Sequence, residues 1–117
     1  MSVAVRHAPD ESRYEIWVDD ELAGFTVYRP KGRRLAFTHT ETLPAFAGRG
    51  LATQLVAGTL DEVRTEGREV LPFCPFVRRF IAEDPSYLDL VPAPQRARFD
   101  LPAAADPEPT PPPEAGG

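Results

Sequence analysis

A glycine turn in the middle of the chain carries the clearest chemistry in the sequence. Gly48 and Gly50 stand directly before a stretch in which apolar residues recur at helical spacing. A glycine turn at a helix start leaves backbone N–H groups unpaired at the positive end of the helix dipole. Such a site suits an anion such as a pyrophosphate, so the turn predicts a phosphate-binding helix start.

Two common nucleotide motifs make demands that this turn does not meet. A phosphate-binding loop of the Walker type needs Lys and then Ser or Thr after its second glycine, where the chain has Leu51 and Ala52. A dinucleotide fingerprint needs a third glycine where Thr53 stands, and a preceding strand–helix–strand rhythm. Two glycines alone are more often a plain tight turn, and only their context favours a functional role.

A histidine and a carboxylate precede the glycine turn on an expected strand. With a two-residue period, Leu35, Phe37, His39 and Glu41 are expected to share one strand face. A carboxylate beside a histidine can accept or relay a proton, so Glu41 is a candidate general base and His39 a candidate relay. An exposed carboxylate and a hydrogen-bonded packing histidine stay open as alternatives.

One cysteine and one tyrosine complete the candidate catalytic set. Cys74 lies in an apolar run, where a cysteine is most often a small buried residue, and no base partner stands near it in sequence. Tyr87 could supply a proton through its phenol or close the core with its ring. A single cysteine cannot form an internal disulfide, and no Cys/His cluster has metal-ligand spacing, so we expect no metal.

The elements that position these residues follow from hydrophobic periodicity and turn residues. Strands are expected over 2–6, 13–18, 22–28, 35–41 and 69–74, a long helix over 49–66, and a short helix from Pro75 that ends before Pro85. Pro72 cannot donate to a central ladder, so the last strand is expected at an edge or splayed from its neighbour. The expected fold is α+β, with a mostly antiparallel meander followed by helix, strand and short helix.

Length, charge and composition limit the possible functions. The chain has 117 residues, enough for one domain, and a formal net charge of −5, which argues against general nucleic-acid binding. No apolar run approaches a membrane span and no hydrophobic signal segment begins the chain, so we expect a cytoplasmic protein without a membrane partner. Residues 1–99 form the expected domain, and the Ala-, Pro- and acid-rich residues 100–117 an expected disordered tail.

Taken together, these features resemble the GNAT superfamily of acetyl-CoA-dependent N-acetyltransferases. His39–Glu41, Gly48–Ala52 and Leu71–Val77 are similar to the short YjdJ-type subgroup, and the likeness runs from Tyr14 to Val91. Ala45 stands where the superfamily usually has Gln or Arg, so that phosphate contact is not carried over. Asp84 replaces a histidine of the subgroup before the Pro-X-Tyr ending, so no role of that histidine is carried over.

The resemblance implies how acetyl-CoA would be held. A splay between the fourth and fifth strands would hold the pantetheine arm, and the glycine turn the pyrophosphate. Leu43 would bond the arm through its backbone, and Cys74 and Phe76 would face the splay. The residues implied around the phosphates are Ala47, Gly48, Arg49, Gly50, Leu51 and Ala52.

The resemblance also implies a reaction. An acetyl group would pass directly from acetyl-CoA to a primary amine, either a small amine or an exposed lysine, with Glu41 as base and Tyr87 as acid for the departing thiolate. The alternative is a CoA-binding or interaction module without significant turnover, which recruits a partner through its proline-rich end. We expect a monomer or a weak homodimer, and no metal cofactor.

Overall fold

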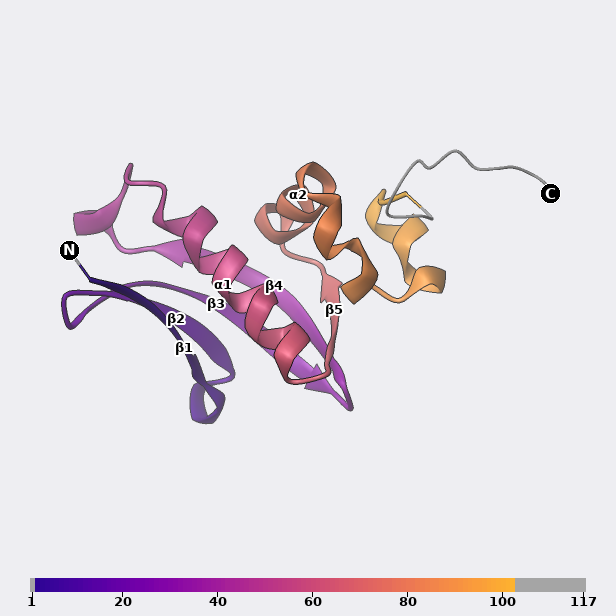
Figure 1. The fold of residues 1–117 in the computed structure, drawn as a ribbon, viewed down its shortest axis with the longest axis horizontal. Coiled ribbons are helices and arrows are strands. Elements are labelled where there is room, and N and C mark those ends of the chain that lie inside the picture. The colour runs from indigo at the N-terminus through magenta and orange to yellow at the C-terminus, as the bar shows by residue number, and fades with distance from the viewer. Residues whose placement is uncertain (1, 103–117) are drawn as a thin grey trace.

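Five strands form one sheet whose spatial order follows the chain, β1-β2-β3-β4-β5 (Figure 1). The computed structural model describes residues 2–102. Neighbouring strands are antiparallel from β1 to β4, and β5 pairs with β4 in parallel. The strands are β1 (Val3–Ala8), β2 (Arg13–Val18), β3 (Glu21–Lys31), β4 (Arg34–Thr42) and β5 (Glu69–Pro72). The expected meander and α+β class are confirmed, and Pro72 ends a strand at the sheet edge.

One long helix covers one face of the sheet (Figure 1). α1 (Leu51–Thr65) buries an apolar stripe against the strands, with Leu55, Leu60 and Val63 fully covered. Gly67 ends it, with a φ of 71° and an N–H that donates to the Arg64 carbonyl at 3.1 Å. The next N–H, from Arg68, reaches Val63 O at 3.1 Å, which is the pattern of a glycine-terminated helix. The expected stop at Gly67 is thus confirmed.

The remaining elements pack at the β5 end of the sheet. α2 (Pro75–Glu83) begins with proline at its first position, and two 3-10 segments, Pro85–Leu90 and Ala93–Phe99, follow it. Phe99 and Leu101 are buried in the core, and Leu101 belongs to residues 100–117, which the sequence analysis expected to form a tail. The rest of the expected tail, residues 103–117, lies outside the described residues.

Leu35, Phe37, His39 and Glu41 were expected to share one face of β4. This expectation is wrong because the strand contains a bulge. Val27 and Tyr28 are consecutive on β3, yet their partners on β4 are His39 and Phe37, so Thr38 is an extra residue in the ladder. One extra residue moves every following side chain to the other face. Phe37 is therefore fully buried on the α1 side, whereas the His39 side chain is 59% exposed on the opposite face.

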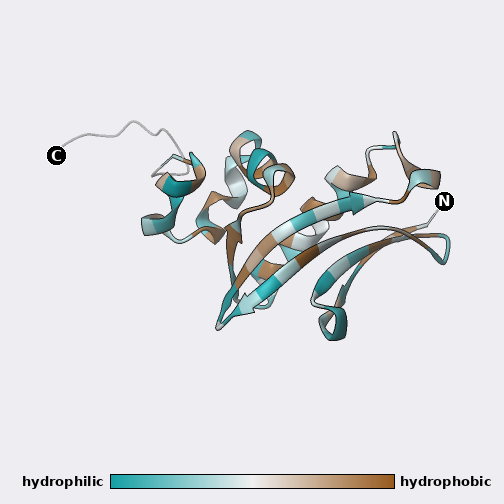
Figure 2. Ribbon diagram, turned by 180° about the vertical axis from the view of Figure 1, so that it is seen from behind, coloured by the Kyte–Doolittle hydropathy of each residue, from teal (hydrophilic) through white to brown (hydrophobic). Residues whose placement is uncertain are grey.

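On the sheet face turned away from α1, no helix of the described part of the chain covers β1, β2 and β3 (Figure 2). Glu41 follows His39 onto this open face. Within residues 2–102 no helix is long and apolar enough to cross a membrane, and no group of three or more His, Cys, Asp and Glu side chains could hold a metal ion.

Candidate active site

The start of α1 is built without any side-chain cap. Gly48 and Gly50 both have left-handed φ angles, of 80° and 71°, and Gly50 is the N-cap residue. A residue with a side chain would be strained in either conformation. No atom lies within 4 Å of the position where a Cβ would stand on either glycine, so the space in front of the turn is open. The first-turn N–H groups therefore remain available to an anion from solution.

Arg49 lies between the two glycines and supplies the positive charge of this site. Its guanidinium carbon is 5.3 Å from the centroid of the Phe46 ring, in the cation–π range, and its side chain is exposed. In the described part of the chain no carboxylate pairs with it. A free arginine beside unpaired amides fits a phosphate, because both features favour negative charge.

A cavity of about 290 Å³ lies between the first turn of α1 and the helix α2. Thr53 lines it on the α1 side, and Phe76, Arg79 and Phe80 line it from α2. The Phe76 side chain is 39% exposed, which is unusual for a large apolar residue and leaves its ring available to a ligand. The sequence predicted Phe76 as a cofactor contact but not Arg79, since helical spacing marks Arg79 only as a polar position.

The strands β4 and β5 separate beside this cavity. Their last paired residues are Phe37 and Pro72, whereas β4 continues to Thr42 against β3. Among the described residues, the edge of β4 from residue 38 to 42 has therefore no partner strand on the β5 side. This is the splay that the family resemblance implied, and its uncovered backbone can pair with an extended ligand.

Two threonines and the cysteine close the bottom of the splay. Thr40 Oγ1 is 2.9 Å from Thr26 Oγ1 and 3.3 Å from Cys74 Sγ, while the Cys74 N–H donates to Phe37 O at 2.8 Å. Thr26 and Cys74 are only 1% and 3% exposed. Sequence analysis identified Cys74 but missed both threonines, because their contact depends on the strand irregularity at Thr38. Cys74 thus has a hydroxyl partner and no basic partner among the described residues.

His39 and Glu41 are neighbours, as expected, with Nε2 and Oε1 3.1 Å apart. Both are substantially exposed, His39 at 59% and Glu41 at 46% of their side-chain areas. Gly24 lies beside the Glu41 backbone, where a Cβ would be 2.6 Å from the Glu41 carbonyl oxygen. A glycine is therefore needed at residue 24 to let β4 approach at the level of the carboxylate.

Both the N–H and the carbonyl of Leu43 form hydrogen bonds within the protein. Its N–H donates to Ala23 O at 2.8 Å, and its carbonyl accepts from the Phe46 N–H at 2.9 Å. The implied bond from Leu43 to the pantetheine arm would have to use the second lone pair of that carbonyl. Ala47 precedes the glycine turn, and Leu51 and Ala52 begin α1 directly after it.

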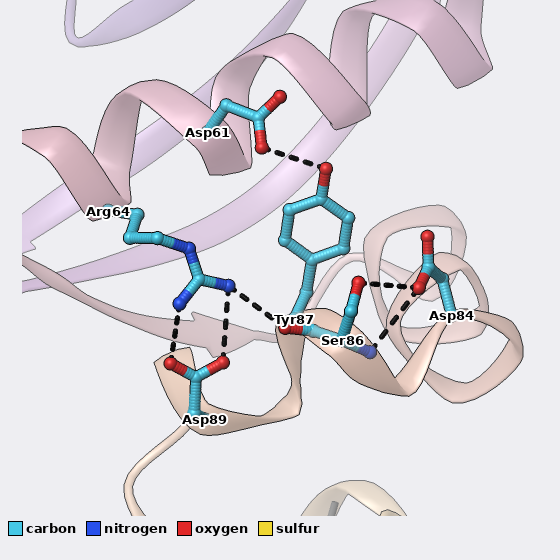
Figure 3. Close-up of polar contacts among 6 residues, drawn as sticks. All are labelled: Asp61, Arg64, Asp84, Ser86, Tyr87 and Asp89. Atoms are coloured by element: carbon cyan, nitrogen blue, oxygen red, sulfur yellow. Dashed lines mark hydrogen bonds and ion pairs between the residues drawn. The ribbon is translucent and has the colours of Figure 1, made fainter.

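Tyr87 is held on the side of α1 rather than at the splay (Figure 3). Its hydroxyl donates to Asp61 Oδ1 at 2.8 Å, and burial together with this carboxylate raises the pKa of Tyr87 to about 12. Arg64 lies over the same ring at 5.7 Å and forms a two-pronged pair with Asp89, at 2.6 and 3.1 Å. No described hydrogen bond joins Tyr87 to Cys74 or Glu41, so its visible role is to fasten the segment after α2 to α1.

Asp84 begins that same segment as a helix cap. Its Oδ1 accepts hydrogen bonds from Ser86 N at 3.3 Å and Ser86 Oγ at 2.7 Å (Figure 3). An aspartate at a helix start satisfies amides that would otherwise be unpaired. Asp84 therefore stabilises the start of the segment that follows α2.

A comparison of sequences identifies the family to which the chain belongs. Residues 13–90 match the family described as GCN5-related N-acetyltransferase, which is more than half of the chain. The protein therefore belongs to the GCN5-related N-acetyltransferase family and is an acyltransferase enzyme. No curated protein matches the chain in sequence.

A solved structure shares the fold. The solution structure of a GCN5-like protein from Staphylococcus aureus is similar over 76% of this chain and 87% of its own, with a TM-score of 0.57 and 16% sequence identity. At this identity the likeness concerns the fold alone. The overall arrangement of the mixed sheet and its helices is thus similar to that of a solved GCN5-like structure.

Proposed function

We propose that this protein, a member of the short YjdJ-type subgroup, transfers an acetyl group from acetyl-CoA directly to a primary amine. The observation that carries the proposal is the conjunction of an uncapped helix start with a splay between β4 and β5. The first suits a pyrophosphate and the second an extended amide-bearing arm, which are the two recognisable parts of coenzyme A. Membership of the family supports the same ligand.

The unpaired amides and the positive charge at the helix start suit the phosphates of acetyl-CoA, while Glu83 and Asp84 also line the cavity between the helices. Amides at the start of α1, together with Arg49, would bind the phosphates. Phe76 and Arg79 would line the path along the cavity between the helices. Acetyl-CoA supplies an activated thioester, and the edge of β4 beyond Phe37 would hold the arm that carries it.

Glu41 is the proposed general base. A primary alkylamine has a pKa near ~10.4 and is almost entirely protonated at neutral pH, so a proton must leave before the nitrogen can attack. The Glu41 carboxylate is accessible on the open face, and the bonded His39 holds one of its oxygens in place. The amine nitrogen then forms the amide bond to the acetyl carbon, and the carbon–sulfur bond breaks with its electron pair left on sulfur.

The acceptor is a small amine or an exposed lysine, and the protein acts as a monomer or weak homodimer in the cytoplasm. The Glu41 side chain is 46% exposed, so it is accessible to either acceptor. Cys74 lines the splay rather than serving as a nucleophile, because its sulfur has a hydroxyl partner and no base.

Two measurements test the proposal. Acetyl-CoA at about 100 times its dissociation constant should stabilise the protein by roughly 2.7 kcal/mol, which thermal denaturation detects as a shift of several degrees. An amine panel followed by release of free CoA then identifies the acceptor. No thermal shift at millimolar acetyl-CoA would remove the cofactor assignment, and binding without CoA release on any amine would favour a non-catalytic module.

A further inference from the structure

The sheet face away from α1 carries an unbroken row of aromatic and charged side chains. The Arg6 guanidinium carbon is 5.3 Å from the centroid of the Trp17 ring, and Trp17 Nε1 donates to Glu15 Oε1 at 3.0 Å. Arg13 Nε donates to the other Glu15 oxygen at 2.7 Å, and its guanidinium carbon is 4.6 Å from the centroid of the Phe25 ring. Each member therefore orders the next across three strands.

The row continues to the proposed base. The Phe25 ring centroid is 6.5 Å from that of His39, which bonds Glu41. The strand register places Arg6 opposite Glu15, Glu15 opposite Phe25, and Phe25 opposite Glu41. These four residues thus form one line across β1, β2, β3 and β4. Three strand spacings of ~4.8 Å separate its ends by roughly 14 Å.

The two ends of this line differ in charge. Glu41 contributes a carboxylate at one end, whereas Arg6 at the other end has no carboxylate partner within residues 2–102. A hollow of about 250 Å³ beside Arg6 and Trp17 is also lined by Asp19 and Asp20. Asp19 Oδ1 accepts a hydrogen bond from the Ser2 N–H at 2.8 Å. An anionic group would therefore be accepted on the Arg6 side of the hollow and repelled on the aspartate side.

We propose that this face is the docking surface for a lysine-bearing peptide segment. The lysine amine lies at Glu41, the peptide crosses Phe25 and Trp17, and an acidic side chain of the peptide pairs with Arg6. About four extended residues at ~3.3 Å each span the roughly 14 Å between the ends. The acidic residue is thus about four positions from the lysine. This inference rests on the proposed function, because it assigns the acceptor class of the same site.

The chemistry of the row favours a peptide over a free small amine. A small amine would contact only the Glu41 end, which leaves the ordered aromatic and arginine side chains on the remaining three strands without a ligand. Arg, Trp and aromatic residues are the types that carry most of the energy in protein–protein contacts. Phe25 and Trp17 are both half-buried, so their rings are fixed while part of each surface stays accessible.

The test uses binding as well as turnover. Blocked peptides with one lysine and a glutamate four residues before or after it are compared with peptides in which arginine replaces the glutamate. Trp17 is the only tryptophan of the chain, so its fluorescence reports docking without acetyl-CoA. We expect one glutamate peptide to bind on the order of fivefold more tightly than its arginine counterpart, which is the scale of an exposed ion pair.

Reversing the charge of Arg6 tests whether Arg6 pairs with the acidic residue of the peptide. Arg6→Glu should invert the order of the two peptides, whereas Lys31→Glu, an exposed cation six residues from Phe25 on β3, should leave the order unchanged. Phe25→Ser should weaken both peptides by roughly tenfold, as expected for a central aromatic contact. Thermal denaturation of each variant confirms that it is folded, and Arg6→Glu decides the question if Phe25→Ser is not.

Failure of this inference is separable from failure of the proposed function. Equal binding of the two peptides, or acetylation of small amines with no change in Trp17 fluorescence on peptide addition, would overturn the docking surface and leave the acetyltransferase standing. Peptide-dependent fluorescence in a protein that does not bind acetyl-CoA would leave the docking surface standing and overturn the proposed acetyl transfer. If the Arg6→Glu variant still binds the glutamate peptide more tightly than the arginine peptide, Arg6 does not pair with the acidic residue of the peptide.

Discussion

The two ends of α1 use their polar groups in opposite ways. At the glycine-turn end, the helix begins without a side-chain cap and Arg49 has no carboxylate partner in the described chain. At the other end, Glu66 accepts from the Tyr14 hydroxyl at 2.9 Å and lies 3.2 Å from His7 Nδ1 and 3.3 Å from Arg68 Nε. We call the glycine-turn end of α1 the open end and the Glu66 end the closed end.

The closed end is a fully paired polar cluster. His7 stacks on Tyr14 with centroids 4.1 Å apart, and its Nε2 is 2.6 Å from the Tyr28 hydroxyl. Burial raises the pKa of both Tyr14 and Tyr28, and the Glu66 carboxylate adds to the rise. Hydrogen-bonding capacity is satisfied by the protein itself at the closed end and is left for a ligand at the open end. The contrast predicts that substitutions at the open end change function and that those at the closed end change stability.

The largest expected effect belongs to Glu41, the proposed base on β4. Glu41→Gln keeps size and polarity but removes proton acceptance, so turnover should fall by ~10²-fold to 10⁴-fold. Acetyl-CoA affinity should stay the same, because Glu41 lies on the open sheet face rather than at the glycine turn. Raising the pH should restore part of the rate, since more of the acceptor amine is then neutral.

Steady-state kinetics and a binding isotherm check this prediction together. Glu21→Gln is the matched control, because Glu21 is an exposed glutamate at the start of β3. Unaltered turnover in Glu41→Gln would move the base assignment to His39 or to a water-mediated route. An acetyl group trapped on Cys74 would replace direct transfer by a covalent route.

The next effect concerns the closed end. Glu66→Ala leaves the buried Tyr14 hydroxyl without an acceptor, so the free energy of unfolding should fall by about 1–3 kcal/mol. Tyr14→Phe removes the hydroxyl itself and should cost less, and the double variant should be more stable than the sum of the two losses implies. Denaturant unfolding measures all three, with Glu62→Ala on the exposed side of α1 as the control. A loss of acetyl-CoA affinity in Glu66→Ala would break the proposed division between the two ends.

The sequence predicted the elements better than the side-chain directions. Alternation in β2 and helical spacing in α1 identified both, because burial of one face imposes a period that composition reveals. The extra residue at Thr38 has no such signature, since a threonine suits a regular strand as well as an irregular one. The predicted face of His39 and Glu41 was wrong for that reason.

Long-range polar contacts could not be predicted from the sequence either. Thr26, Thr40 and Cys74 meet only because β4 crosses between two other strands, and a threonine has no charge or spacing that marks it as a partner. Leu101 packs into the core although an aspartate and a proline flank it, and composition alone does not reveal this contact. The glycine turn was predictable because positive φ restricts the residue type at the position itself.

A smaller effect is expected from the charge at the open end. Arg49→Glu should weaken acetyl-CoA binding by roughly tenfold, and the weakening should diminish at high salt because exposed charges are screened. The fold should be unaffected, since the Arg49 side chain is exposed and lies over the Phe46 ring rather than in the core. Titration calorimetry at two ionic strengths measures both quantities. Lys31→Glu, with the same change of charge at a distant hairpin, should bind acetyl-CoA like the unchanged protein, and equal losses in the two variants would mean that Arg49 acts only through net charge.

The smallest effect tests whether Tyr87 belongs to the closed end or the open end. Its hydroxyl donates to Asp61 and its ring lies beside Arg64 and Phe80, so Tyr87→Phe should lower the free energy of unfolding by about 0.5–1.5 kcal/mol and leave turnover nearly unchanged.

The folded-state pKa of Tyr87, about 12, lies above the ordinary value of 10.0. The stabilising contribution of the hydroxyl is therefore complete below pH 10 and is lost as the pH rises towards 12, so the stability difference between the two proteins should shrink over that range. Unfolding measured at pH 8 and pH 11, with CoA release at pH 8, gives both answers. A large loss of turnover in Tyr87→Phe with unchanged acetyl-CoA affinity would instead make Tyr87 the acid for the departing thiolate, which would require the segment after α2 to move towards the splay during the reaction.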